Sequence, residues 1–259
     1  MLENSGILKR RLRQKEILLG SWITIGNTTV AEIMARSGFD WLVIDLEHSM
    51  ISLDMAGDLI RVIDLCGVSP LVRLTSNDTN QIKRVMDAGA HGVVVPSVNS
   101  AEEAMLAVSA TRYPPIGTRG VGLGRAQKYG IGFEEHLKWQ ADGPLVIVMI
   151  EHKNALENIE DILHVRGVDG FIVGPYDLSC SLGIPGDFSN PLFISALKRI
   201  RLAGELMGCP TGLHVVEPSL SNLKKAISDG YQLIAYGVDM RFLDKASRAG
   251  VSHFKEVLK

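Results

Sequence analysis

The sequence predicts a (β/α)8 barrel that occupies residues 1–259 as a single domain. From about residue 18 to the end, eight short apolar runs alternate with eight amphipathic or Ala/Leu-rich stretches. Eight strand–helix units in about 250 residues is the size typical of such a barrel. Most of the runs are continuously apolar, as in WLVID and VIVMI, which is the pattern of parallel strands covered on both faces.

Each element follows from a local signal. Runs rich in β-branched residues mark the strands, and apolar residues at helical spacing mark the helices. Asp78 and Ser100 are suitable helix N-caps, and Gly38, Gly89 and Gly230 suit helix ends. The predicted strands are 18–25, 41–47, 70–75, 92–98, 146–151, 170–175, 210–215 and 232–239. The predicted helices are 29–37, 52–65, 79–88, 101–110, 154–164, 191–207, 218–229 and 240–258.

An open doubly wound sheet is the competing fold class. The turn after the first strand, 26–28, reads Gly-Asn-Thr and lacks the glycine fingerprint of a dinucleotide site, so we expect no bound nucleotide. One long connection, 111–143, joins strands four and five, and connections of that size commonly cover an active site. Arg119 and Arg125 in this connection either meet an acidic ligand tail or are solvated.

Composition excludes several classes of protein. The 27 basic and 29 acidic residues give a net charge of −2, which argues against a nucleic-acid partner. The longest aliphatic stretch, 145–150, is too short to cross a membrane, and the N-terminus lacks the apolar run of a secretory signal. Cys66, Cys180 and Cys209 are odd in number and show no CxxC pair, which predicts free buried thiols and a cytoplasmic protein.

Polar residues gather where the second and third strands end. In a (β/α)8 barrel these carboxyl ends form the catalytic rim. The two-residue period of a strand directs Asp45 and Glu47 to the same inner side, with His48 directly after them. Arg73 points inward from the third strand. Taken alone, Arg73 could be a structural ion pair with Asp45, and His48 could be a solvated loop histidine.

Two more carboxylates, Glu151 and Asp177, follow the neighbouring fifth and sixth strands. Asp177 alone could be a helix cap. Four carboxylates near the barrel axis would repel one another, however, and a divalent cation removes that repulsion. Two oxygen ligands without Cys or His suit Mg²⁺, Mn²⁺ or Co²⁺, whereas a structural zinc takes four protein ligands. Pro175 opens a helical turn whose free N–H groups could hold a substrate carboxylate.

The same strands argue against Schiff-base chemistry. A Schiff-base enzyme of this fold needs a lysine that points inward from a strand. None of the predicted strands contains a lysine, and the nearest is Lys153. The ends of strands seven and eight make a poor phosphate cradle, and the glycine-rich run 120–124 follows a helix, so it is no nucleotide loop.

The motifs at these strand ends resemble those of the HpcH/HpaI aldolase family. This family contains metal-dependent class II pyruvate aldolases, such as 4-hydroxy-2-oxoheptanedioate and 2-keto-3-deoxy-rhamnonate aldolases. The resemblance runs from about residue 20 to 239. Its motifs are GFDWLVIDLEHS (38–49), PLVRLTSND (70–78), TRYPPIGTRGVG (111–122), VMIE (148–151), GVDGFIVGPYDLSCSLG (167–183) and YGVD (236–239).

The resemblance implies a role for each residue of the rim. It implies that Glu151 and Asp177 bind the metal and that Arg73 binds the pyruvyl keto oxygen and stabilises the enolate. It implies that His48 is a catalytic base oriented by Asp45. The remaining implied roles are Glu47 holding metal-bound waters, Asp87 reaching in from a neighbouring subunit, and substrate contacts from Trp22, Met149, Gly174, Pro175, Tyr176 and Leu213. The family also implies a homohexamer, a dimer of trimers with exchanged terminal helices.

Three residues depart from the family pattern. Met149 stands where sugar-acid members usually carry glutamine, and Tyr176 stands where alanine or asparagine is usual; His152 also follows Glu151 directly. We therefore predict a class II aldolase that cleaves a 4-hydroxy-2-oxo acid to pyruvate and an aldehyde, with a ligand preference of its own. A citrate-lyase-like enzyme that acts on an acyl-CoA and a non-catalytic barrel are the alternatives.

Overall fold

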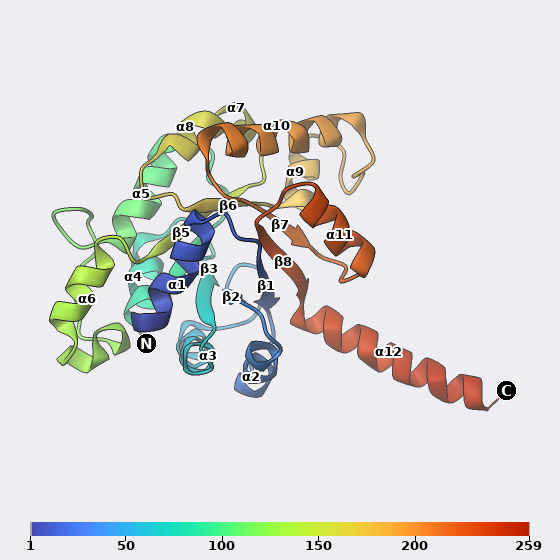
Figure 1. Cartoon of the computed structure of the whole chain (residues 1–259), viewed down its shortest axis with the longest axis horizontal. Helices are drawn as coiled ribbons and strands as arrows, with labels where there is room; N and C mark the ends of the chain where they lie inside the picture. Colours follow the sequence, from blue (N-terminus) through green and yellow to red (C-terminus); the bar gives the residue numbers. More distant parts are fainter. Residues whose placement is uncertain (1, 259) are drawn as a thin grey trace.

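The computed structural model describes residues 2–258 and confirms the barrel. Its eight strands pair in parallel and in sequence order, and β8 closes on β1 (Figure 1). The fold is one domain, as predicted. The strands are β1 (Leu18–Ile23), β2 (Trp41–Asp45), β3 (Ser69–Arg73), β4 (Gly92–Val95), β5 (Leu145–Ile150), β6 (Gly170–Val173), β7 (Thr211–Val215) and β8 (Leu233–Val238).

The helices surround the barrel and agree with most of the predicted ranges. The predicted helix at 154–164 is two helices that meet at Asn158. The helices at 2–13 and 133–140 were not predicted. The helices are α1 (Leu2–Arg13), α2 (Thr28–Arg36), α3 (Leu53–Leu65), α4 (Thr79–Asp87), α5 (Ala101–Thr111), η1 (Arg125–Gly130), α6 (Phe133–Gln140), α7 (Lys153–Glu157), α8 (Ile159–His164), α9 (Pro175–Ser181), α10 (Pro191–Met207), α11 (Leu220–Ser228) and α12 (Asp239–Val257).

Two apolar layers hold the barrel together. Inward side chains of the strands form one cluster, and outward side chains pack against the helices in another. Trp41 fills the interior because Gly20 lies beside it: a Cβ at position 20 would stand 2.1 Å from the indole ring. Leu8 and Leu12 of α1 join the interior cluster, so this helix closes the amino-terminal end of the barrel.

The strands end earlier than predicted at the catalytic rim. β2 stops at Asp45 and β4 stops at Val95, where the predictions ran to 47 and 98. Polar side chains cause this, because they bond the backbone locally instead of continuing the ladder. After β4, for example, Ser97 has a φ of +52°. The rim is therefore built from turns that direct side chains into the barrel mouth.

The long connection 111–143 lies at the opposite end, so the prediction that it covers the active site is wrong. α5 runs back from the carboxyl end of β4, and the connection then returns to the start of β5. Arg119 pairs with Asp87, and Arg125 pairs with the buried Asp64. Both arginines are thus buried in ion pairs and neither is solvated.

Three further features of the chain bear on the predictions. All three cysteines are free, as predicted, but Cys180 is exposed on the short α9 and the other two are only half-buried. α12 projects away from the barrel (Figure 1). Among residues 2–258, no helix is long and apolar enough to cross a bilayer.

Candidate active site

Arg73 lies at the centre of the barrel mouth, at the carboxyl end of β3. β2 and β3 pair with Asp45 opposite Arg73, so both side chains project to the same side. The guanidinium donates from Nε to Oδ1 of Asp45 at 2.8 Å and from Nη2 to Oδ2 at 2.6 Å. Burial acts to raise the pKa of Asp45, but the bonds from Arg73 outweigh it and hold that pKa below its usual value. The ion pair considered from the sequence is therefore present.

Asp45 does not contact the imidazole of His48. Its Oδ1 instead accepts the backbone N–H groups of Glu47 and His48, at 3.0 and 3.2 Å. The His48 side chain is 62% exposed, and its Nε2 lies 3.8 Å from Oε2 of Glu47. The expected bond from Asp45 to the ring is not formed because Arg73 occupies both carboxylate oxygens. Asp45 acts on His48 through the turn that carries it.

Glu47 points into the mouth beside Arg73. Its Oε2 lies 3.3 Å from Nη1 of Arg73, and this buried oxygen accepts no hydrogen bond from the described residues. Burial raises the pKa of Glu47, Arg73 opposes that rise, and the charge of Glu151 adds to it. Ile44 and Leu46 belong to the helix-facing cluster, so the predicted alternation along this segment is confirmed.

One carboxylate oxygen of Glu151 is hydrogen-bonded to Ser97, and the other faces the barrel mouth. It is 5% exposed, directly after β5. Its Oε1 accepts the backbone N–H of Ser97 at 2.7 Å and the Ser97 hydroxyl at 3.2 Å. Its Oε2 faces Gly174, where a Cβ would stand only 2.5 Å from that oxygen. Burial raises the pKa of Glu151, the N–H of Ser97 opposes the rise, and Asp177 adds to it.

Asp177 enters the rim from the first turn of α9. Gly174 is the N-cap of this helix and Pro175 is its first residue, as the sequence suggested. Asp177 is exposed, and its charge acts on Glu151. Tyr176 beside it is 53% exposed and meets Phe188 edge-on, with ring centroids 5.0 Å apart.

The floor of the mouth is aromatic and soft. The guanidinium carbon of Arg73 lies 4.4 Å from the centroid of the Trp22 ring, a cation–π arrangement. Sδ of Met149 lies 3.9 Å from Nη1 of Arg73. The ring of His214 lies 5.3 Å from that of Trp22, and burial lowers the pKa of His214 to about 4, so its imidazole is neutral.

Leu213 lies outside this floor. Its side chain packs among the residues between barrel and helices, because the neighbouring His214 takes the inward position of β7. The predicted substrate contact of Leu213 therefore cannot come from its side chain.

The carboxylates fit a divalent cation. Glu151 presents one oxygen without a hydrogen bond, and Glu47 presents a buried oxygen without one. The charge of Glu151 raises the pKa of Glu47, and the charge of Asp177 raises the pKa of Glu151. Hard oxygen donors in excess over nearby cations are what Mg²⁺ and Mn²⁺ favour. Among the side chains that the structure describes, no group of three or more His, Cys, Asp or Glu residues is placed to hold a metal ion, so two protein carboxylates and water would make up the site.

Asp87 lies at the opposite end of the barrel from these residues. It is the last residue of α4, at the amino-terminal end of the barrel, where it accepts a hydrogen bond from Arg119. It thus takes no part in the site of its own chain, and its suggested role in a neighbouring subunit stays a prediction.

Ser97 and His214 belong to the site but were not predicted. Ser97 lies near the end of the predicted strand 92–98, and a polar residue at a strand end is a usable signal. His214 is inward by the same two-residue period that identified Asp45 and Glu47. Neither residue carries a local motif, so only their long-range contacts with Glu151 and Trp22 reveal their place.

Comparisons with known proteins agree with this geometry. The family model described as HpcH/HpaI aldolase/citrate lyase matches residues 18–246. A 2-keto-3-deoxy-L-rhamnonate aldolase of Klebsiella pneumoniae is 37% identical over 97% of this chain and 94% of its own. An HpcH/HpaI aldolase/citrate lyase family protein from Burkholderia cenocepacia superposes with a TM-score of 0.92 at 32% identity, over 96% and 99% of the two chains. The citrate synthase SbnG superposes with a TM-score of 0.85 at 28% identity, over 96% and 97%.

These matches cover nearly all of the chain, and the curated relatives are aldolases, which cleave carbon–carbon bonds. The prediction of an aldolase-type carbon–carbon lyase is therefore confirmed. Both the strand-end motifs and the barrel that positions them lead to one assignment: the chain belongs to the HpcH/HpaI aldolase/citrate lyase family.

Proposed function

We propose that this protein is a divalent-metal-dependent class II aldolase that reversibly cleaves a 4-hydroxy-2-oxo acid to pyruvate and an aldehyde. The observation that carries the proposal is the convergence of one guanidinium, Arg73, with two incompletely bonded carboxylates, Glu47 and Glu151, in one barrel mouth. No lysine lies in any of the eight strands, which supports enolate chemistry over a Schiff base.

The chemistry needs a base and a group that stabilises negative charge. Cleavage removes the proton of the 4-hydroxyl, breaks the C3–C4 bond to release the aldehyde, and leaves pyruvate enolate, which then takes a proton at C3. Arg73 binds the keto oxygen and stabilises the enolate as charge develops there. His48, exposed at the rim and carried by the turn that Asp45 organises, takes the hydroxyl proton.

Glu151 and Asp177 would hold Mg²⁺, Mn²⁺ or Co²⁺, and the bound ion would polarise the keto oxygen as a Lewis acid. Ser97 fixes the orientation of the Glu151 carboxylate for that role. Glu47 holds water molecules near Arg73. The free N–H groups after Pro175 bind the substrate carboxylate.

The substrate class follows from the relatives and from two side chains. Curated relatives are 2-keto-3-deoxy-L-rhamnonate aldolases, and we infer that a 4-hydroxy-2-oxo acid is also the substrate here. Met149 offers an apolar sulfur beside Arg73, and Tyr176 offers an exposed ring at the rim. Together with Trp22, they favour a ligand tail that is less polar than a sugar acid.

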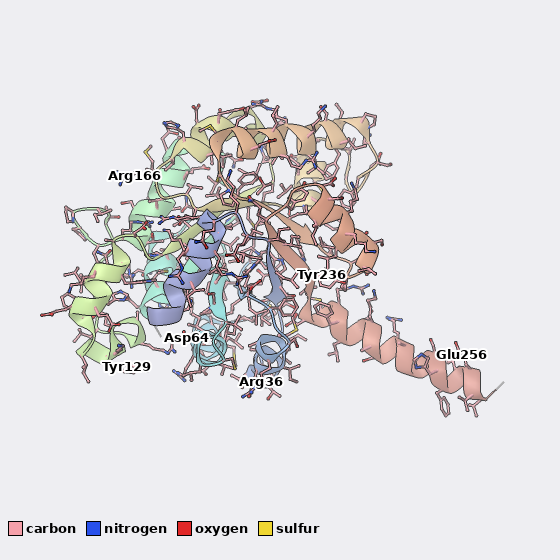
Figure 2. The ribbon with its side chains drawn as sticks, viewed as in Figure 1. Arg36, Asp64, Tyr129, Arg166, Tyr236 and Glu256 are labelled. Atoms are coloured by element: carbon pink, nitrogen blue, oxygen red, sulfur yellow. The ribbon has the colours of Figure 1, made fainter. Side chains whose placement is uncertain are left out.

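We also infer a homo-oligomer, a hexamer by family resemblance, and a cytoplasmic location from the three free cysteines. α12 stands clear of the barrel, with Glu256 labelled near its end in Figure 2. Its exposed apolar residues recur mostly at spacings of three and four, and helices of that kind pack against a partner. They are Met240, Leu243, Val251, Phe254 and Val257.

Exchange of the pyruvate methyl protons for deuterium, followed by NMR, tests the enolate step without knowledge of the aldehyde. We expect exchange that chelation abolishes and that Mg²⁺, Mn²⁺ or Co²⁺ restores. Borohydride with pyruvate should add no mass to any lysine. Full exchange in a metal-free preparation, or a borohydride adduct, would contradict the proposal.

An acyl-CoA substrate is the second candidate, because the family description includes citrate lyases and a citrate synthase is structurally similar. Cleavage of 4-hydroxy-2-oxo acids and of a hydroxyacyl-CoA, assayed side by side, separates the two. Turnover of only the thioester would favour the second candidate.

A further inference from the structure

A cavity lies at the end of the barrel opposite the catalytic mouth. It has a volume of about 800 Å³, and segments that precede strands form most of its walls. These segments include 12–15 before β1, 141–142 before β5, 166–169 before β6 and 207–210 before β7. None of the residues proposed for catalysis lines it. The cavity is therefore separate from the proposed aldolase site.

Arg112 forms part of the wall of this cavity and is 3% exposed. Its Nη1 donates to Oγ1 of Thr111 at 2.6 Å. Among the described side chains, no carboxylate forms an ion pair with this guanidinium; Asp169 and Asp142 act on it only at longer range. A buried charge without a direct counter-ion is costly, so it calls for compensation from another source.

The carboxylates of the cavity are already engaged elsewhere. Asp142 binds Arg13 through two hydrogen bonds of 2.8 Å and lies 3.4 Å from Nζ of Lys9. Asp169 lies 2.9 Å from Nζ of Lys9. These two acids are thus matched by Lys9 and Arg13.

Three cations remain in surplus around the same space. Lys15, Arg112 and Arg166 all line the cavity, and none forms an ion pair within the part of the chain whose side chains are described. Arg112 is buried, whereas Lys15 and Arg166 are exposed at the rim; Arg166 is labelled in Figure 2. The cavity therefore combines an enclosed guanidinium with two accessible positive charges.

We propose that this cavity binds a small oxyanion, a phosphate or a carboxylate, with Arg112 at its base and Arg166 and Lys15 at its rim. The planar guanidinium donates two parallel hydrogen bonds to such a group, and the rim charges attract it. The walls also include both ends of the connection 111–143, through Arg112 and Ile116 at one end and Asp142 at the other. A bound oxyanion joins these two ends and stabilises that connection.

Calorimetric titration with inorganic phosphate and with succinate, at constant ionic strength set by chloride, tests the site in the full-length protein. We expect saturable binding of at least one of the two, with the tighter one identifying the ligand chemistry. Arg112→Gln should weaken binding at least tenfold, and Arg166→Gln should weaken it severalfold. Arg199→Gln is the matched control, because Arg199 is an exposed arginine paired with Glu160 outside the cavity, and it should bind like the parent.

Hydrogen exchange locates the binding, since Arg73 in the mouth also attracts carboxylates. Bound oxyanion should slow amide exchange in 108–116 and 139–143 and leave 45–49 unchanged. Arg166 is exposed, so Arg166→Gln reports on the site even if Arg112→Gln fails to fold. Binding that protects only the mouth, binding unchanged in Arg166→Gln, or no binding above chloride would overturn the proposal.

Discussion

The two ends of the barrel carry the same residue types in different states. The mouth holds His48, Arg73 and carboxylates, and the amino-terminal end holds His91, Arg125 and Asp64. At the amino-terminal end, Nε2 of His91 lies 3.1 Å from one oxygen of Asp64, and Arg125 donates to the other. Burial would raise the pKa of Asp64, but these two partners outweigh it and hold that pKa below its usual value.

The mouth has the opposite balance. Asp45 is satisfied by Arg73, but the pKa values of Glu47 and Glu151 are raised by burial and by like charge. The cluster of His91, Asp64 and Arg125 thus pairs its charged groups with one another, whereas the mouth keeps carboxylate charge without a full set of partners. An unbalanced cluster, more than the presence of His, Arg and Asp, therefore distinguishes a functional site from a structural one.

Substitutions of the two histidines, His48 and His91, should show the largest difference between loss of activity and loss of stability. His48→Ala should lower the rate of 4-hydroxy-2-oxo acid cleavage by about 10²–10⁴-fold, because a positioned general base is worth that much. Its stability should change little, since the side chain is exposed. His91→Ala should instead lower the midpoint of thermal unfolding and leave cleavage per folded molecule intact. Cleavage by His48→Ala at the parent rate would show that His48 is not the base.

Substitution of Arg125 should likewise reduce mainly stability, and substitution of Arg73 should reduce mainly activity. Arg125→Met should cost about 3–5 kcal/mol of unfolding free energy in urea, because it leaves a buried carboxylate short of a partner. Arg73→Ala should raise the barrier to pyruvate exchange by about 2.7–4 kcal/mol. Arg73→Lys, which keeps a charge beside Asp45, controls for folding. If Arg73→Ala and Arg125→Met lost stability and pyruvate exchange to the same extent, the proposed difference between the two ends of the barrel would be wrong.

The carboxylates should shift stability in opposite directions. Asp64 has a depressed pKa, so the stability it contributes is present above its unfolded value, near 3.8, and is lost as the pH falls through the lower folded value. Asp64→Asn should lower stability at pH 7 and weaken its dependence on pH below about 4. Glu151→Gln should stabilise the metal-free protein by about 0.5–2 kcal/mol, as removal of strained active-site charge commonly does, while metal-dependent exchange is lost. Thermal unfolding in chelator across pH measures both.

The smallest expected effect concerns ligand choice. Met149→Gln adds hydrogen-bonding groups beside Arg73, so it should alter the ratios of kcat/KM among short, acidic and sugar aldehydes severalfold, with little change in pyruvate exchange. Tyr176→Ala, at the rim, should widen the same acceptor range. Unchanged ratios in the Met149 variant would make that residue a packing residue beneath Arg73.

Much of the fold and of the candidate site could be predicted because the signals are local. Alternation along each strand placed Asp45, Glu47 and Arg73 inside, and strand adjacency brought Glu151 toward Asp177. The prediction failed for the connection 111–143. This connection follows a helix that runs back from the carboxyl end of β4, so it lies at the amino-terminal end of the barrel. At Leu213 the side chain packs on the helix side of β7, and a substrate contact of this residue stays a prediction.

The alternation of strands and helices, the single domain and the set of polar groups at the rim can all be read from the amino-acid sequence. Period and composition act over a few neighbouring residues, so they can be recognised without coordinates. The partners of those polar groups become visible only in the folded barrel. Arg73 and Asp45 are 28 residues apart in the sequence, and Ser97 and Glu151 are 54 residues apart. These hydrogen-bond partners are therefore determined by the closure of the barrel. In the closed barrel, Asp45 accepts hydrogen bonds from Arg73 and not from the ring of His48.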